Sequence, residues 1–378
     1  RQAASHGARV GIVERDRVGG DCVNYGCIPE KFMSFAAGFS RWFNAANDCG
    51  WSEPQRKFSW SEFMAAKNRE IRHLNQTHLT HLQEAGVDFI RGFATFVDPH
   101  RLAVGDRTLM AEKILIAVGA SDVKPDIPGT EYAISWSQVF QLSQQPRDII
   151  IVGSSYIDVK TAGNLNGMGS KVTLIFEEDR VLPQFDADVS RAIQTGLIKR
   201  GIEVAPNTKT EQIELVPEGY CLTLSGANPG TKTVDIVLYA VQRSPDLYNL
   251  QLEKAGVQVN QAGAIVVDPF HRTSQSNIFA IGDCTERTKY KLTPVAVAEG
   301  KSFADQEFST QFDPVRYDFI PISLSSYPEA ATVGLSEEQA REKFGDAVLC
   351  YCKEFYTLFE RLSHWDETTL IKLVTHRD

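Results

Sequence analysis

The stretch GGDCVNYGCIPEK, residues 19–31, decides how the rest of the chain is interpreted. Its two cysteines, Cys22 and Cys27, are five residues apart, which in a regular helix gives a rise of ~7.5 Å and a rotation of ~140°. Their Cα atoms would then lie beyond the separation that a disulfide tolerates. A bridge between them therefore requires an irregular turn, and Gly26 and Pro29 are residues that can form one.

Pro29 also suits the first turn of a helix that runs through Met33. Cys27 would then lie at a helix N-terminus, where the helix dipole favours the thiolate form. A reducible disulfide beside an activated thiolate is a redox centre in physical terms. The spacing alone could also belong to two unrelated thiols, which is the less favoured interpretation, and the surrounding sequence decides between the two.

Working outward, residues 9–13 form an apolar, β-branched strand that ends at Glu14 and belongs to the second half of a βαβ unit. Residues 32–45 and 60–85 have the periodicity of helices. Residues 148–179 contain a continuous apolar strand, a glycine turn, a helix and a second apolar strand. That order within ~30 residues is typical of a Rossmann-type unit.

The composition excludes several classes of function. The 378 residues are 43% hydrophobic and carry a net charge of −9, which argues against a nucleic-acid partner. No run approaches the ~20 apolar residues of a membrane span, and no signal peptide is visible. The seven cysteines are an odd number at low density, which indicates a reducing compartment rather than a secreted disulfide scaffold. The length allows two or three domains.

Residues 19–31 resemble the active-site segment of the pyridine nucleotide–disulfide oxidoreductases, and the whole chain looks most like the glutathione reductases of cyanobacteria and plastids. Further matches occur in family order along the chain. They are ILIAVGA (114–120), DIPG (126–129), LPQFD (182–186), GAIVVD (263–268), AIGD (280–283), LTPVAVAEG (292–300) and PEAATVGLSEEQAREKFG (328–345). The resemblance implies a location in the cytoplasm or the plastid stroma.

The fold implied by this resemblance is α/β, with doubly wound Rossmann-type domains for FAD and NAD(P) and the start of an α+β interface domain. Residues 1–130 and 248–317 would form the two parts of an FAD-binding domain. Residues 131–247 would form an NAD(P)-binding-like domain, and residues 318–378 would begin the interface domain. The family's first glycine-rich turn would precede Arg1, and its C-terminal His–Glu pair would follow Asp378.

The resemblance also implies roles for individual residues. Cys22 would exchange with the disulfide substrate, and Cys27 would lie against the flavin of FAD. Glu14 would hold the adenosine ribose, and Asp283 the ribityl chain. Each acid has a simpler interpretation, because a glutamate at a strand end is often only solvated and an aspartate after glycine often only forms a turn. The remaining cofactor contacts implied are Gly20, Gly119, Gly153, Tyr156, Glu177 and Arg243.

Several substitutions fall at the nicotinamide site. Ser155 replaces the middle glycine of the second glycine-rich turn, where a side chain obstructs the approach of a pyrophosphate. Asp158 places a negative charge near the helix start, and the expected repulsion is ~1 kcal/mol or more. Glu177 and Glu178 stand where glutathione reductases place basic residues, which favours NAD over NADP. An exposed acidic turn without any role is the alternative.

Other substitutions fall at the substrate site and beneath the flavin. Arg1 matches an arginine that binds a glutathione carboxylate, and His78 stands where a tyrosine is usual. Gln306 replaces a second arginine, a loss that commonly weakens carboxylate recognition by ~1.5–3 kcal/mol. Glu30 and Lys160 carry the charges of a family lysine and glutamate in exchanged order. We expect the two side chains still to meet, because an unpaired buried charge is costly.

Two functions therefore compete. In the first, the chain is a glutathione-reductase-like enzyme that passes electrons from NAD or NADP through FAD to Cys22–Cys27 and on to a small-molecule or protein disulfide. It would then act as the homodimer usual in the family. In the second, it is a degenerate relative that serves as a structural or binding subunit of a larger assembly.

Overall fold

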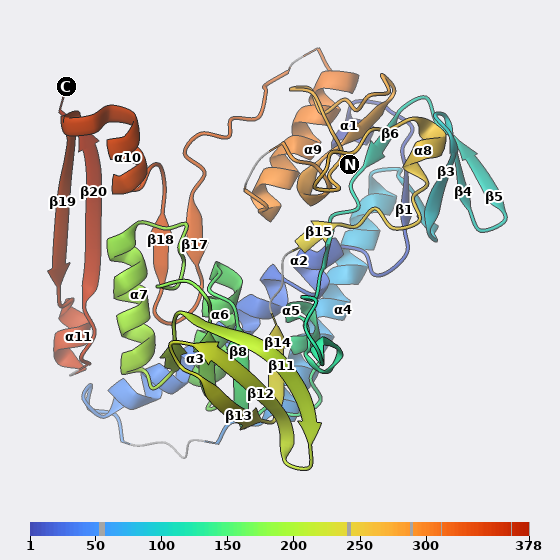
Figure 1. Ribbon diagram of the computed structural model, residues 1–378. Coiled ribbons are helices and arrows are strands. Elements are labelled where there is room, and N and C mark those ends of the chain that lie inside the picture. The colour runs from blue at the N-terminus through green and yellow to red at the C-terminus, as the bar shows by residue number, and fades with distance from the viewer. Residues whose placement is uncertain (53–56, 240–242, 288–289, 311, 364, 378) are drawn as a thin grey trace. The chain divides into compact units, whose positions relative to one another are not determined.

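The computed structural model describes residues 1–52, 57–239, 243–287, 290–310, 312–363 and 365–377. The chain divides into two compact units (Figure 1). Unit 1 comprises Arg1–Gly26, Arg69–Val123 and Gln242–Asp318, and unit 2 comprises Cys27–Asn68, Lys124–Val241 and Phe319–Asp378. The assignment of FAD-binding, NAD(P)-binding and interface domains to residue ranges stays a prediction.

Unit 1 contains two parallel strand pairs, β1 (Gly11–Glu14) with β2 (Asp88–Arg91) and β6 (Ile114–Ile116) with β16 (Ile278–Ala280). Parallel strands share the direction of their carboxyl ends, so the segments that follow them are placed to hold a ligand. The strand expected to end at Glu14 is confirmed.

The other strands of unit 1 are antiparallel. They are β3 (Ala94–Asp98), β4 (Arg101–Val104) and β5 (Arg107–Met110) in one sheet, and β7 (Ala120–Asp122) with β15 (Arg243–Pro245) in another. The helices are α1 (Gln2–Ser5), α2 (Gly20–Asn24), α8 (Leu252–Ala255) and α9 (Thr293–Phe308), with the 3₁₀ turn η2 (Gly282–Cys284). A core that includes Phe96, Ile114, Ile265 and Ile278 joins strands β3, β6 and β16.

Unit 2 is built on a parallel sheet of four strands in the order β10-β9-β8-β14. The strands are β8 (Asp148–Val152), β9 (Lys171–Ile175), β10 (Glu203–Ala205) and β14 (Ile236–Tyr239). Helix α6 (Tyr156–Gly167) connects β8 to β9, and α7 (Ala187–Lys199) precedes β10. This arrangement confirms the Rossmann-type unit predicted for residues 148–179.

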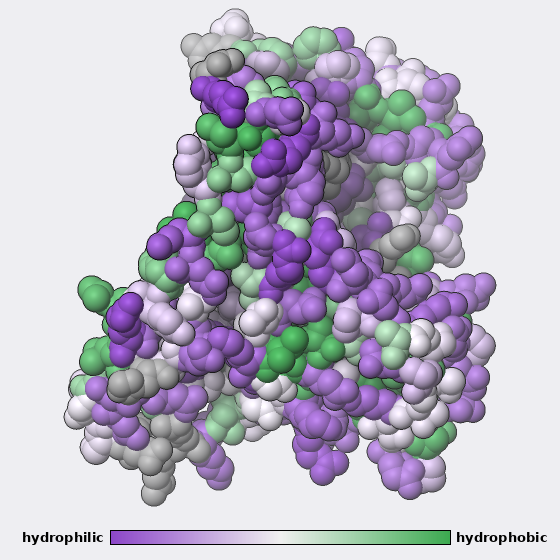
Figure 2. Space-filling view, turned by 60° about the vertical axis from the view of Figure 1, so that its left-hand side comes forward, coloured by the Kyte–Doolittle hydropathy of each residue, from purple (hydrophilic) through white to green (hydrophobic). Residues whose placement is uncertain are grey.

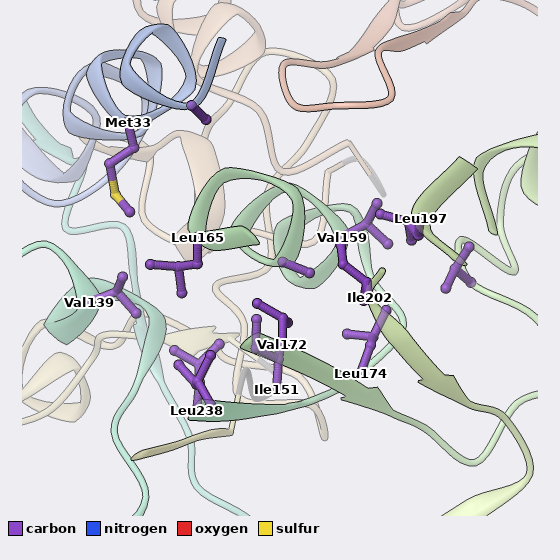
Figure 3. Packing of buried hydrophobic residues seen from close by; sticks show 14 of the residues in the cluster. Met33, Val139, Ile151, Val159, Leu165, Val172, Leu174, Leu197, Ile202 and Leu238 are labelled. Carbon is purple, nitrogen blue, oxygen red and sulfur yellow. The ribbon is translucent and has the colours of Figure 1, made fainter. Parts of the chain in front are cut away.

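The core of unit 2 explains why β8 has no polar alternation. Ile149, Ile150 and Ile151 are all completely buried, as expected for a strand covered on both faces. Figure 3 shows side chains of α6, such as Val159 and Leu165, pointing toward the strands. Helix α3 (Cys27–Ala46) packs on α6 and adds Met33 to the same core.

The rest of unit 2 consists of antiparallel strands and short helices. It includes the antiparallel strands β11 (Thr208–Val216), β12 (Gly219–Gly226) and β13 (Gly230–Val234), and the hairpins β17 (Ile322–Leu324) with β18 (Ala330–Thr332) and β19 (Val348–Phe355) with β20 (Thr369–His376). Its short helices are η1 (Thr130–Tyr132), α5 (Trp136–Val139), α10 (Glu337–Phe344), η3 (Gly345–Ala347) and α11 (Leu358–Leu362). Helix α4 (Trp60–Glu84) begins in unit 2 and continues into unit 1.

The face drawn in Figure 2 is mostly hydrophilic, with hydrophobic residues in small groups. Within the described ranges, no helix combines the length and the apolarity that crossing a membrane requires.

Candidate redox and cofactor sites

The cysteine segment is a short helix followed by a break and a long helix. Helix α2 contains Cys22 and ends at Asn24, and α3 begins at Cys27 itself. Between them, Tyr25 leaves the helical region with φ −138° and ψ 14°. The irregular turn predicted between the two cysteines is therefore present, and Cys27 is the first residue of a helix of 20 residues.

Hydrogen bonds on one side of this break hold α2 in place. The buried amide of Asn24 donates to the carbonyl of Gly20 at 2.9 Å. Asn75 on α4 donates to the Asn24 side chain at 2.9 Å and to the carbonyl of Val18 at 2.7 Å. Cys22 is half-buried and belongs to unit 1, whereas Cys27 is exposed and begins unit 2.

Glu30 and Lys160 meet, as expected from their exchanged charges. Lys160 Nζ lies 2.7 Å from Glu30 Oε2, and the two side chains are 11% and 6% exposed. The ammonium also lies 4.8 Å from the centre of the Tyr156 ring. Burial raises the pKa of Glu30, and the neighbouring Cys27 adds to this effect, while the attraction of Lys160 opposes it. The desolvation of this carboxylate thus exceeds the compensation that its partner supplies.

Two acids predicted to hold FAD lie at or just beyond the carboxyl ends of strands in unit 1. Glu14 is the last residue of β1, and its carboxylate accepts the backbone N–H of Asp16 at 2.9 Å. Asp283 lies in η2, directly after β16. Burial raises the pKa of Asp283, which indicates a site that shields the carboxylate from water.

Arg243 connects Asp283 to the cysteine helix. The guanidinium pairs with Asp21, the residue before Cys22, and donates to the carbonyl of Ala120. It lies 3.7 Å from Asp283 Oδ2 and 3.7 Å from Asp122 Oδ1. Arg243 was predicted to contact the cofactor; in unit 1 its guanidinium lies among three carboxylates, and one of these belongs to Asp283, the predicted flavin acid. Residues 240–242, which precede Arg243, lie outside the described ranges.

The glycines predicted to contact FAD have the required conformations. Gly20 and Gly119 have φ of +62° and +72°, values that favour glycine. A Cβ added to either would have no heavy atom within 4 Å, so open space adjoins the backbone at both positions. Together with Glu14 and Asp283, this open backbone fits the close approach of a dinucleotide.

The second glycine-rich turn differs, because its own side chains fill it. Gly153 has φ +145°, and an added Cβ would lie 2.4 Å from the carboxylate of Asp158. That carboxylate accepts the backbone N–H of Ser155 at 2.8 Å, and Ser155 caps α6 in a reciprocal capping box. Asp158 is 1% exposed, and burial raises its pKa to about 7. The turn therefore fits a pyrophosphate poorly, because the Asp158 carboxylate occupies both the N–H donor and the space that a pyrophosphate would use.

The remaining predicted residues are more dispersed. Glu177 is exposed just after β9, and Tyr156 is the first residue of α6. Arg1 is exposed at the start of α1, and His78 is half-buried within α4. Gln306 donates to Glu307 Oε1 at 2.8 Å. The hydrogen bonds and ion pairs found among the described residues do not join Arg1, His78 and Gln306 into one site.

Sequence reasoning missed three acids of unit 1. Asp21 stands inside the cysteine segment, but only the fold reveals that it pairs with Arg243. Asp122 is 3.7 Å from the same guanidinium. Glu299 is buried on α9 within the LTPVAVAEG match, where an acid among apolar residues was a visible signal.

Comparisons with known proteins agree with this geometry. The family profile described as pyridine nucleotide-disulphide oxidoreductase matches residues 1–300. A glutathione reductase of Nostoc sp. is 41% identical over 385 residues, which cover 99% of this chain and 83% of that protein. A glutathione reductase of Burkholderia cepacia is 36% identical, with coverage of 100% and 83%.

A solved structure is also similar. The HOCl-induced flavoprotein disulfide reductase RclA from Escherichia coli matches with a TM-score of 0.87 at 27% identity, covering 99% of this chain and 82% of that one. The parallel strands of both units, the broken helix between Cys22 and Cys27 and these sequence matches lead to one assignment. The chain belongs to the pyridine nucleotide–disulphide oxidoreductase family and has its FAD/NAD(P)-binding fold.

Proposed function

We propose that this chain is a flavin-dependent disulfide reductase of the glutathione reductase type, with Cys22 and Cys27 as its redox pair. The observation that carries the proposal is the break between α2 and α3, which makes Cys27 the first residue of a long helix. A helix N-terminus stabilises a thiolate, and the thiolate is the reactive form in disulfide exchange.

The proposed exchange is balanced in atoms and electrons. The thiolate of Cys22 attacks one sulfur of the substrate disulfide, and the first product thiol leaves after taking a proton. Cys27 then attacks the Cys22 sulfur, the second product thiol leaves, and a Cys22–Cys27 disulfide forms. Two electrons and two protons, delivered as a nicotinamide hydride and a solvent proton, restore the two thiols.

FAD would be held in unit 1 by the side chains of Glu14 and Asp283, and it would approach the backbone closely at Gly20 and Gly119. When bound, the flavin supplies the chemistry that passes an electron pair from a nicotinamide to a disulfide. Arg243 pairs with Asp21 and lies 3.7 Å from Asp283, so one cation offsets part of the negative charge near the cysteine helix.

Nicotinamide binding at the turn of residues 153–158 would be weak. The carboxylate of Asp158 occupies the N–H of Ser155, which a pyrophosphate would otherwise approach. The exposed Glu177 after β9 disfavours the 2′-phosphate of NADP and suits the ribose hydroxyls of NAD. NADH is therefore the proposed electron donor, with NADPH the poorer one.

The proposed substrate is a small-molecule or protein disulfide, with Arg1 and His78 as candidate contacts. Gln306 is uncharged, so it would bind a substrate carboxylate through one neutral hydrogen bond. An arginine at this position would make a stronger, charged and bidentate contact. Glutathione disulfide would consequently be a poor substrate. The predicted compartments, cytoplasm or plastid stroma, stay predictions.

A homodimer is proposed because α3 presents an apolar stripe in unit 2. Phe35, Phe39 and Trp42 follow one another at helical spacing and are 55%, 59% and 57% exposed. Aromatic side chains this exposed are typical of surfaces that a partner covers. The alternative of a structural subunit in a larger assembly has no feature of the described residues in its favour, and the relatives compared above are reductases.

The test is steady-state turnover of the purified, flavin-loaded protein. NADH or NADPH is supplied with glutathione disulfide or a small aromatic disulfide, and thiol release is measured. We expect NADH-dependent thiol release that is lost in Cys22→Ser and Cys27→Ser but kept in the control Cys352→Ser, an exposed cysteine on β19. Equal, negligible rates in the wild type with every pairing of donor and disulfide would contradict the proposal.

A further inference from the structure

Glu299 is a buried carboxylate in unit 1 that the proposed chemistry leaves without a task. It is 1% exposed on α9. Its Oε2 accepts the backbone N–H of Gly282 at 2.6 Å, and its Oε1 accepts the hydroxyl of Tyr317 at 2.8 Å. Both oxygens are thus engaged by donors from segments outside the helix.

Burial of this acid is costly, so its retention needs a reason. Among the described residues, no ion pair within 4.0 Å neutralises Glu299; the nearby charged groups are Arg287, which stacks on the Tyr317 ring at 5.3 Å, and the carboxylate of Asp283. Burial lowers the pKa of the neighbouring His271, which therefore does not supply a dependable positive charge. The two hydrogen bonds are the compensation that the structure provides.

One of these hydrogen bonds acts on the turn that contains Asp283. Gly282 is the first residue of η2 and has φ +71°, a conformation that favours glycine. A Cβ added there would lie 3.3 Å from that of Ala296, so the turn rests directly on α9. The backbone N–H of Thr285 closes the turn on the Gly282 carbonyl at 3.0 Å.

We propose that Glu299 is a positioning residue, which fixes the Gly282 turn so that Asp283 faces the flavin ribityl chain. The inference rests on the proposed function only in placing FAD beside Asp283. Packing of α9 against the turn does not require a carboxylate at position 299, because Ala296 already contacts the turn. Glutamine at position 299 can preserve both hydrogen bonds, because its oxygen accepts from Gly282 and its amide donates to Tyr317.

The test compares Glu299→Ala and Glu299→Gln with Ser302→Ala, a control that removes another buried hydrogen bond of α9, the one to the Asp313 carbonyl. Amide hydrogen exchange over residues 282–285 is measured in flavin-free protein, and the FAD dissociation constant by reconstitution. We expect exchange about tenfold or more faster and FAD binding about tenfold or more weaker in Glu299→Ala. Glu299→Gln and Ser302→Ala should resemble the wild type in both measurements.

Two results would overturn the proposal. If Glu299→Ala keeps wild-type exchange at the turn and only loses thermal stability, as Ser302→Ala does, Glu299 is a core residue without a positioning role. If Glu299→Gln is as impaired as Glu299→Ala, charge rather than geometry is responsible. Tyr317→Phe, which removes only the second hydrogen bond, serves if Glu299→Ala does not fold. Amide hydrogen exchange is measured in flavin-free protein. A protein that binds no FAD would therefore count against the proposed function, whereas the exchange measurement would still test the role of Glu299.

Discussion

The exchanged ion pair of unit 2 gives the sharpest prediction for mutagenesis. Glu30 and Lys160 are 2.7 Å apart and nearly excluded from water. At an effective dielectric constant of about 20, their attraction is ~6 kcal/mol before desolvation is subtracted. Breaking such a pair by removing one partner commonly costs ~3–5 kcal/mol, because the other charge remains buried.

The two single variants should differ, because the stranded group can neutralise itself. In Lys160→Gln, the penalty is limited by protonation of Glu30, which costs ~3.7 kcal/mol at pH 7 and only ~1 kcal/mol at pH 5 for an ordinary glutamate. Burial already raises the pKa of Glu30 and lowers this cost further. In Glu30→Gln, the stranded group is a cation, which acid cannot neutralise, so lowering the pH brings no relief.

The assay is the free energy of unfolding from urea titrations at pH 7 and pH 5. We expect Lys160→Gln to recover most of its loss at pH 5, Glu30→Gln to recover none, and the double variant to lose at least ~1 kcal/mol less than the sum of the singles. The exchanged variant Glu30→Lys/Lys160→Glu should approach wild-type stability. Lys31→Gln, which removes an exposed charge next to Glu30, is the control. Additive losses that do not depend on pH would refute the reasoning.

Three further predictions concern α6 and α3. Burial raises the pKa of Asp158 to about 7, so the folded protein holds a proton that the unfolded chain loses. The unfolding free energy should therefore fall by a few kcal/mol as the pH rises from ~4 through 7, and Asp158→Asn should flatten this fall. An unchanged pH profile in Asp158→Asn would contradict this prediction. The variant Ser155→Gly/Asp158→Ala frees the turn beside Gly153 and should tighten NADH binding about tenfold or more in stopped-flow flavin reduction at pH 8; weaker binding would count against the account of this turn. Phe39→Glu should shift the protein from dimer to monomer in light scattering, and an unchanged mass would show that the α3 stripe is not the interface.

Local patterns in the sequence were sufficient for much of the fold. The uninterrupted apolar run of β8 predicted a strand of a Rossmann-type unit, and Gly26 with Pro29 predicted the break that makes Cys27 a helix start. The meeting of Glu30 and Lys160 was predicted because the family resemblance pairs these two positions and an unpaired buried charge is costly.

Other contacts between distant segments were beyond such reasoning. Arg243 pairs with Asp21, 222 residues earlier, and no local pattern specifies that register. The charge of Asp158 was recognised, but its capping box with Ser155 was not, although a serine followed three residues later by an acid is a known helix-start signal. Its burial, which raises its pKa, depends on how closely α6 packs on Gly153 and appears only in the folded chain.

The other proposals depend on Cys22 and Cys27 forming a working redox pair beside a flavin. The most direct measurement is the visible absorbance spectrum of the purified protein during anaerobic reduction by dithiothreitol. We expect flavin bands and a new long-wavelength band when the dithiol forms. In Cys22→Ser, where Cys27 has no disulfide partner, this band should be present before any reductant is added, and in Cys27→Ser it should be absent. A folded protein that binds FAD without developing this band, or that binds no FAD when FAD is supplied, would contradict this expectation.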